Sequence, residues 1–192
     1  MTGNPTQAIV DMPDDLPFTP TSAEPKLVQH PVHDDGEEHA SMSGPLRTVE
    51  AIRRYIEGGN GVLTVRSRKS GTRFTFRTKR PKLEEVAEGR GRPIWVSLLS
   101  GPSNVDDYAF LGTLWPSANG FTYRHSPKSR TSESAPSVRA LKWIAHGLNV
   151  EPDAFLQQAE FWHEGRCGRC GRRLTVPESI ELGFGPECAG RA

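Results

Sequence analysis

All three cysteines of this 192-residue chain lie within its last 26 residues, and their spacing restricts how that part can fold. Cys167 and Cys170 are separated by two residues, and each is followed by a glycine. Cys188 follows after 17 further residues. Two thiolates at this spacing can bind one tetrahedral ion, and the glycines allow a tight backbone turn around it. Thiolates also suit a borderline-soft divalent ion. The pattern predicts a zinc knuckle with Zn²⁺ as cofactor, in which the bound metal supplies folding free energy that so short a segment lacks.

Three sulfurs leave one position of a tetrahedral ion to be filled. The nearest histidine precedes Cys167 by four residues and would complete a Cys3His set. The predicted metal ligands are therefore His163, Cys167, Cys170 and Cys188. Other groups that could take the fourth position are His146, Glu164, Glu187 and a water molecule. If a water held it, the site would resemble a catalytic zinc centre instead of a structural one.

The segment between the cysteine pair and Cys188 has the signals of a short helix. Thr175 and Glu178 have the spacing of a capping box, and Gly183 would end the helix after Leu182. A redox function for the Cys-x-x-Cys pair is the competing interpretation. It is disfavoured because no βαβ pattern precedes the pair and because Cys188 would then have no function.

The first 45 residues differ in composition from the rest of the chain. They hold eight acidic residues, one lysine and seven of the 16 prolines, so their net charge is −7, whereas the remainder carries +8. Such a segment cannot bury enough apolar surface to offset its ordering entropy. We therefore expect a disordered acidic tail over residues 1–45, an α+β domain over 46–150 and a zinc-binding module over 151–192.

The central region has alternating helix and strand patterns. Thr48 is a good N-cap for a helix that Gly58-Gly59 ends, and Pro136 opens a second amphipathic helix that ends near Gly147. Alternating apolar and polar residues between glycine-rich turns predict five strands, at residues 62–68, 72–79, 94–99, 108–114 and 121–125. The expected fold is α+β, a roughly five-stranded antiparallel meander flanked by two helices, followed by the zinc knuckle.

The first two predicted strands form a strongly basic hairpin. Alternation places Leu63, Val65, Phe74 and Phe76 on one face and the basic residues on the other. Residues 66–82 contain eight bases and no acid, a density of like charge that favours an anionic partner such as a phosphate backbone. The predicted nucleic-acid-binding residues are Arg66, Arg68, Lys69, Arg73, Arg77, Lys79, Arg80, Lys128 and Arg130. The alternative is a soluble edge hairpin whose charge only prevents edge-to-edge pairing.

Stacking on nucleic-acid bases would require exposed aromatic side chains beside these charges. Phe74 and Phe76 share the apolar face and are expected in the core. Tyr123 and Trp95 are the other candidates, but the sequence does not show which way they point. Contact with the phosphate backbone is therefore predicted, and base reading is not.

Residues suited to catalysis are few. Asp106-Asp107 could bind magnesium and His125 could act as a base, as in a nuclease. An aspartate pair of this kind more often caps a turn, and Ser103 and Ser134 have no identifiable catalytic partner. We expect neither enzymatic activity nor a small-molecule substrate.

The C-terminal sequence resembles that of a family of uncharacterised bacteriophage and bacterial proteins. The residues that carry the resemblance are Gly165-Arg-Cys-Gly-Arg-Cys-Gly-Arg-Arg-Leu-Thr-Val-Pro-Glu-Ser-Ile and Gly183-Phe-Gly-Pro-Glu-Cys-Ala. The likeness extends upstream to about residue 48, and in similar sequences a histidine matches the position of His163. The resemblance implies a mobile-element origin and a zinc module, but it brings no established activity.

Two function classes remain from the sequence. The first is a non-catalytic zinc-binding protein that contacts the backbone of DNA or RNA through the basic hairpin. The second is a phage or mobile-element module that docks on a host protein, with zinc purely structural. The chain has no run of 18 apolar residues and no basic, apolar start typical of a secretion signal, so we expect no membrane partner and a cytoplasmic location in a bacterial host.

Overall fold

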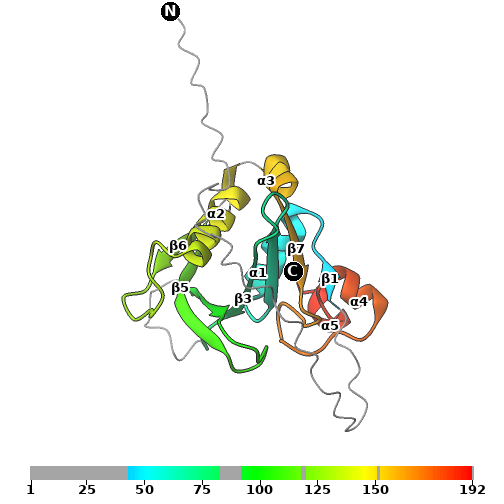
Figure 1. The fold of residues 1–192 in the computed structure, drawn as a ribbon. Helices are drawn as coiled ribbons and strands as arrows, with labels where there is room; N and C mark the ends of the chain where they lie inside the picture. The colour runs from blue at the N-terminus through cyan, green and yellow to red at the C-terminus, as the bar shows by residue number, and fades with distance from the viewer. Residues whose placement is uncertain (1–42, 83–91, 118–119, 151, 192) are drawn as a thin grey trace, which may run out of the picture. The chain divides into compact units, whose positions relative to one another are not determined.

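The computed structural model describes residues 43–82, 92–117, 120–150 and 152–191, and these form an α+β fold (Figure 1). The predicted fold class is thus confirmed. Most of the expected disordered tail (residues 1–45) cannot be compared, because residues 1–42 lie outside the described residues. No helix in the described ranges is long and apolar enough to cross a membrane.

All strands belong to one antiparallel sheet with the order β1-β7-β2-β3-β4-β5-β6. The five predicted strands are its continuous part: β2 (Val62–Ser67), β3 (Arg73–Lys79), β4 (Ile94–Leu99), β5 (Tyr108–Ser117) and β6 (Gly120–His125). The predicted strand count is wrong by two, because β1 (Gly44–Pro45) and β7 (Ala159–His163) extend the sheet beyond β2.

Strand β7 comes from a part of the chain that the sequence assigned to the zinc module. It follows α3 (Pro152–Gln158) and pairs with β2 from Leu63↔His163 to Ser67↔Ala159. The sheet therefore contains residues from both sides of the expected boundary at residue 150, and the described residues from position 43 onward belong to one compact unit.

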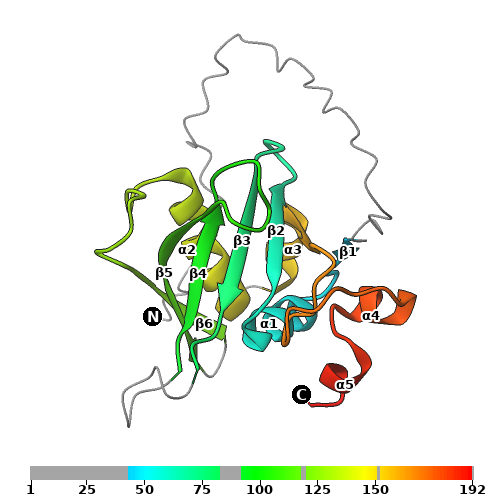
Figure 2. The ribbon, with the colours of Figure 1, turned by 90° about the horizontal axis from the view of Figure 1, so that it is seen from below.

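Two of the helices lie on one side of the sheet. Figures 1 and 2 show α2 (Pro136–Val150) and α3 on the same side of β3 and β4, and in Figure 2 the strands lie in front of them. Side chains that point toward the helices form the core, and they include Leu63, Val65, Phe76, Val96, Leu114 and Phe121. We call the opposite side the open face. As the alternation predicted, it carries Thr64, Arg66, Arg73, Thr75, Arg77 and Lys79 of β2 and β3.

Helix α1 (Val49–Gly58) has the predicted ends. The Thr48 side chain accepts the N–H of Ala51 at 3.1 Å, and Gly59 ends the helix in a left-handed conformation. Helix α2 begins at Pro136 as predicted but runs past Gly147 to Val150. Gly147 does not end the helix, because its missing side chain makes room for the Phe155 ring: a Cβ there would lie 2.2 Å from Phe155 Cδ2.

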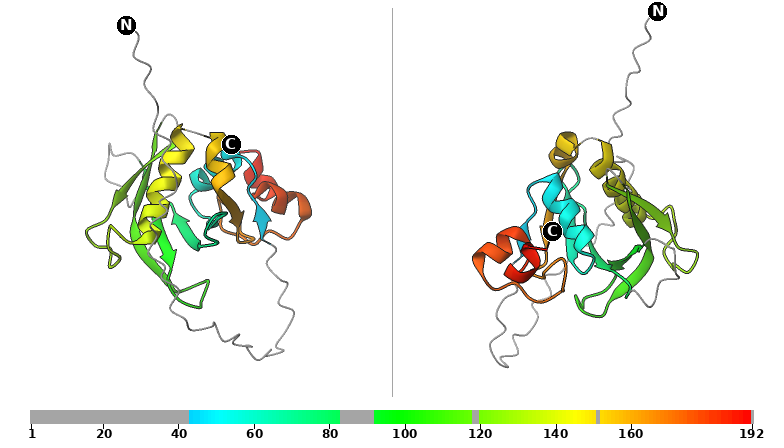
Figure 3. Two further views of the ribbon diagram at one scale, coloured as in Figure 1. Left: turned by 45° about the horizontal axis from the view of Figure 1, so that its top comes forward. Right: turned by 180° about the vertical axis from the view of Figure 1, so that it is seen from behind.

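Two short helices, α4 (Pro177–Leu182) and α5 (Pro186–Ala189), follow the cysteine pair and lie beside β1 and α1 (Figure 3). Gly183 ends α4 as predicted, but the capping box does not form. The N-cap is Val176, which makes no side-chain bond, and Pro177 begins the helix. Proline suits the first helical position because its missing N–H would have no intrahelical partner there and its φ is already helical.

We expect β7 to be essential to the fold. Phe161 is 3% exposed on the helix face and its ring centroid lies 4.9 Å from that of Phe155. Phe161→Ala should lower the free energy of unfolding by about 3–5 kcal/mol in urea denaturation. The matched control is Glu160→Gln on the open face of the same strand, which breaks a partly exposed ion pair with Arg68 and should cost at most about 1 kcal/mol. Equal effects of the two substitutions would contradict this placement.

Candidate metal centre and basic face

The backbone around Cys167 and Cys170 folds into a knuckle. The N–H of Gly171 donates to the carbonyl of Cys167 at 2.9 Å, and the N–H of Cys167 donates to the carbonyl of Arg172 at 2.8 Å. Gly171 has φ 72°, a left-handed conformation that glycine adopts without strain. These bonds close the tight turn that the glycine spacing predicted.

Tyr55 of α1 joins this knuckle to the sheet. Its hydroxyl accepts the N–H of Val62 at 3.1 Å and donates to the carbonyl of Arg166 at 2.8 Å. Its ring lies against Gly168, where a Cβ would come within 2.8 Å of Tyr55 Cδ2. Burial is the main reason that the pKa of Tyr55 lies well above its usual value, so the hydroxyl stays protonated and able to donate.

The three cysteines converge. Helix α5 carries Cys188 back to the knuckle, and the Sγ atoms of Cys167, Cys170 and Cys188 all lie within 4.8 Å of one another. Sulfurs bound to one tetrahedral zinc at about 2.3 Å would be about 3.8 Å apart, so this group fits a shared ion after a small closure. The sulfurs line a cavity of about 230 Å³ that Glu187 also lines.

The backbone around the sulfurs favours negative charge at one of them. Burial raises the pKa of the Cys167 thiol, but hydrogen bonds from the backbone at Cys170, Gly185 and Arg169 outweigh burial and bring the pKa below its usual value. Burial and the two neighbouring sulfurs raise the pKa of Cys188 to about 11. The donor set thus suits a cation shared by three sulfurs.

His163 is not part of this group, which corrects the predicted ligand set. It is fully buried at the end of β7, its Nε2 donates to the carbonyl of Ile180 at 2.6 Å, and its Nδ1 accepts the N–H of Gly165 at 3.1 Å. Both ring nitrogens therefore hold the backbone between β7 and α4, and neither is available to a metal. In this structure His163 has a structural role, although its spacing from Cys167 and the family resemblance both made it resemble a ligand.

The alternatives for the fourth position are also placed. His146 is exposed on α2, and Glu164 accepts a hydrogen bond from the Thr64 hydroxyl on the open face. Glu187 is the only alternative residue that lines the cavity at the sulfurs among the described residues.

The nine predicted nucleic-acid-binding residues do not form a single surface. Arg66, Arg73, Arg77 and Lys79 share the open face, and Arg66 lies directly opposite Arg73 in the strand register. Arg68 and Lys69 lie at the exposed β2–β3 turn, where Arg68 pairs with Glu160 at 2.8 Å.

The other three predicted residues have different surroundings. The Arg80 guanidinium donates to the carbonyl of Glu57 at the end of α1, and burial lowers its pKa. Lys128 and Arg130 line a separate cavity of about 380 Å³, together with Asp106 and Asp107. An anion there would meet carboxylates as well as cations, so this pair does not extend the basic surface of the hairpin.

The sequence named Trp95 and Tyr123 as candidate exposed aromatic residues without showing which way they point, and it did not single out Trp115 or Trp162. Trp95 lies opposite Lys79, and Trp162 lies opposite Thr64. Trp115 shares the face of Thr113, to whose hydroxyl its Nε1 donates at 3.1 Å. All three indoles are partly exposed. Tyr123 instead points to the helix side, because it lies opposite the buried Leu114.

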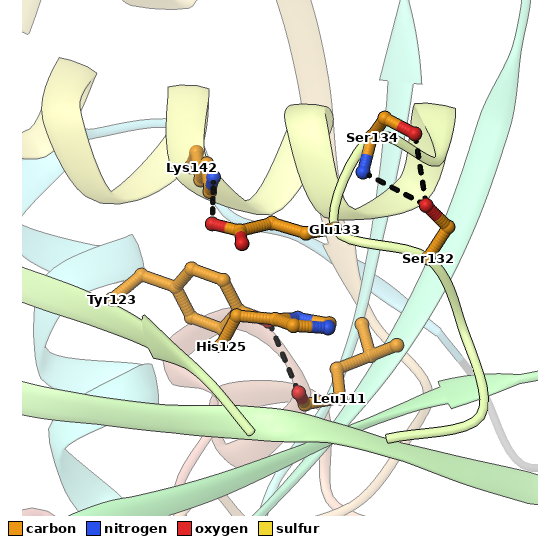
Figure 4. Close-up of polar contacts among 7 residues, drawn as sticks. All are labelled: Leu111, Tyr123, His125, Ser132, Glu133, Ser134 and Lys142. Atoms are coloured by element: carbon orange, nitrogen blue, oxygen red, sulfur yellow. Dashed lines mark hydrogen bonds and ion pairs between the residues drawn. The ribbon is translucent and has the colours of Figure 1, made fainter. Parts of the chain in front are cut away.

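Two of the residues considered for catalysis, His125 and Ser134, make local contacts (Figure 4). The Tyr123 hydroxyl lies 2.9 Å from His125 Nδ1 and donates to the carbonyl of Leu111 at 3.2 Å. Burial, with a smaller contribution from Glu133, raises the pKa of Tyr123 to about 12. Glu133 in turn accepts from Lys142 at 2.7 Å.

Asp107, Ser103 and Ser134, which were also considered for catalysis, make turn contacts. Asp107 caps a turn by accepting the N–H of Ser103 at 2.8 Å. Ser134 contacts Ser132 through hydroxyls 2.8 Å apart. Each of these side chains therefore stabilises a turn of its own loop.

We expect His163 to make stability depend on pH. Burial lowers its pKa below the ordinary 6.5, against a smaller opposing effect of the Ile180 carbonyl. The unfolded chain therefore takes up this proton more readily, so the stabilisation is complete above about pH 6.5 and is lost as the pH falls below it. The free energy of unfolding, measured by urea denaturation, should fall more between about pH 7.5 and about pH 5.5 in the wild type than in His163→Gln. All other titratable groups are shared by the two proteins. An equal fall of the free energy of unfolding in both would therefore refute the role given to His163.

Comparison with known proteins covers only the C-terminal part of the chain. No curated protein and no solved structure matches this chain. Residues 157–192 match the model of a family of unknown function, DUF6011, whose description specifies neither a metal nor a phage origin. The matched segment contains β7, the knuckle and α4 with α5, which is the region that holds all three converging cysteines.

Proposed function

We propose that this chain is a non-catalytic zinc-binding protein that contacts the phosphate backbone of nucleic acid through the open face of its sheet. The zinc ion would be held by Cys167, Cys170 and Cys188 and would stabilise the C-terminal knuckle. DNA and RNA share the backbone chemistry that this surface would recognise.

The metal part of the proposal is supported by the convergence of sulfurs from two separate segments. Cys188 is 18 residues beyond Cys170, and α4 and α5 return it to the knuckle. Three reduced thiols that share one cavity suit a soft divalent ion, which needs no redox chemistry to stabilise the fold. Glu187 or a water would complete the tetrahedron from the cavity.

The nucleic-acid part is carried by the opposed pair Arg66 and Arg73. Like charges directly opposite each other destabilise a sheet, so a surface that keeps such a pair is suited to an anion lying across both strands. Glu160 lies directly opposite Arg66 on the β7 side, but its carboxylate is bound by Arg68, and within the described residues neither guanidinium of the opposed pair has an ion-pair partner. Lys79 continues the positive charge along the same face of β3, about 20 Å from Arg73 at the usual strand rise.

A second candidate function is docking on another protein through the C-terminal segment. Val176 and Leu182 at the two ends of α4 are 50% and 51% exposed, which is high for aliphatic side chains. Such an interface would bind through apolar contact and depend little on salt, whereas phosphate binding weakens steeply as salt rises.

Metal content tests the first part of the proposal. Protein purified without chelator should contain about one zinc per chain by elemental analysis, and Cys170→Ser should lose it together with folding of the knuckle. His163→Gln is the matched control, since it changes a residue expected from the sequence to be a ligand but should keep the zinc. Loss of zinc in His163→Gln with folding intact, or no zinc in the wild type, would reject this site.

Salt dependence tests the second part. Replacing Arg66, Arg73 and Lys79 together with serine should weaken binding to an oligonucleotide and lower the slope of log affinity against log salt by about 2–3. The charge-matched control replaces Arg47, Lys142 and Arg191, none of which lies on a strand, and should have little effect. Fluorescence anisotropy at several salt concentrations gives both quantities. If the two triple variants behave alike, the open face is not the binding surface.

A further inference from the structure

Two indoles lie side by side on the open face between two cations. Trp95 of β4 lies opposite Thr113 of β5, and Trp115 follows two residues further along the same face of β5. These are diagonal neighbours, a relation in which side chains as large as tryptophan come into reach. No helix in the described residues covers this side of the sheet (Figure 2), and both indoles are partly exposed.

The cations flank the indoles in the same register. Lys79 lies directly opposite Trp95 on the β3 side, and Arg124 lies directly opposite Thr113 on the β6 side. The Arg124 guanidinium is 5.1 Å from the centroid of the Trp115 ring, so it contacts the indole as well as solvent. The four side chains together form what we call the indole cluster: Lys79, Trp95, Trp115 and Arg124.

We propose that the indole cluster binds single-stranded nucleic acid, with bases stacking on Trp95 and Trp115 and phosphates held by Lys79 and Arg124. This inference rests on the proposed function and adds a base-stacking site to its backbone contacts. A single strand is the fitting ligand because its bases have free faces, whereas the bases of a duplex are already stacked on one another. Both DNA and RNA offer this chemistry.

The third indole of the open face is in different surroundings. Trp162 lies on β7 between Glu160 and Glu164, which share its face at two-residue spacing. Carboxylates on both sides repel phosphate, so Trp162 is not part of the proposed site. Its partial exposure makes it a matched control, since it is the same residue type on the same face of the same sheet.

The charge distribution gives the bound strand a direction across the sheet. From the indole cluster the positive charge continues across β3 and β2 through Arg77, Arg73 and Arg66. It ends at the β7 edge, where Glu160 lies directly opposite Arg66. Arg77 is partly committed, because its Nη1 donates to the carbonyl of Val105 at 2.7 Å and its guanidinium lies 3.9 Å from the Tyr108 ring centroid. The exposed cations available to phosphate are thus Lys79 and Arg124 at the cluster and Arg66 and Arg73 beyond it.

Fluorescence anisotropy with labelled 12-mers tests the proposal on the full chain. The probes are oligo-dT, oligo-rU, an abasic deoxyribose-phosphate strand of equal charge, and a 12-base-pair duplex. Wild-type protein should bind oligo-dT or oligo-rU at least about 5-fold more tightly than the abasic strand, because only the first two can stack. The difference between dT and rU distinguishes DNA from RNA as the preferred strand.

Substitution of the indoles identifies where stacking occurs. Trp95→Leu and Trp115→Leu should each weaken binding of the preferred strand about 5-fold or more and leave binding of the abasic strand and its salt slope unchanged, whereas Trp162→Leu should change neither. Thermal denaturation of each variant checks folding, and the wild-type comparison of base-bearing and abasic strands needs no variant.

Two negative outcomes are distinguishable. Equal affinity of the wild type for base-bearing and abasic strands, or an effect of Trp162→Leu as large as that of Trp95→Leu, would overturn the stacking site and leave backbone binding intact. No binding of any nucleic acid by the wild type at low salt would overturn the proposed function and this inference together.

Discussion

The buried hydroxyl of Tyr55 is the contact on which the arrangement of the C-terminal part depends. It connects three segments that are distant in sequence: α1, the start of β2 through Val62, and the knuckle through Arg166. The ring of Tyr55 also lies 5.7 Å from that of His163 and 6.0 Å from that of Phe184, between the knuckle and α4. Because the knuckle is attached to the sheet through this joint, Tyr55 helps to hold Cys167 and Cys170 where α5 brings Cys188 to them.

The two faces of the sheet differ in burial and composition. One face is covered by helices and supplies the core, so its side chains are constrained by packing. No helix in the described residues covers the open face, which carries large indoles and opposed guanidiniums. Like charges opposite each other do not stabilise a sheet. The composition of the open face is understandable as a surface shaped by a ligand with anionic and planar groups.

Much of the fold was predictable from local pattern. The five central strands, both ends of α1, the start of α2 and the apolar face of the hairpin follow from alternation, helical spacing and turn residues. Strand β7 was not predictable, because Ala159–His163 is a short stretch after a helix and its pairing with β2 joins residues about 100 positions apart. The end of α2 was also misplaced, since Gly147 serves the packing of Phe155, a contact that no helix-ending signal encodes.

At the candidate site, the sequence by itself determined which thiols belong together, because a Cys-x-x-Cys turn with flanking glycines constrains its own backbone and implies a partner sulfur in Cys188. It also determined which hairpin side chains are basic and on which side of the strand they stand. Only the tertiary structure decided that His163 bonds to the carbonyl of Ile180, and that Trp95 and Trp115 are diagonal neighbours flanked by Lys79 and Arg124. The physical reason is that spacing along the chain limits which atoms can reach one another, whereas strand pairing and burial select which of them do.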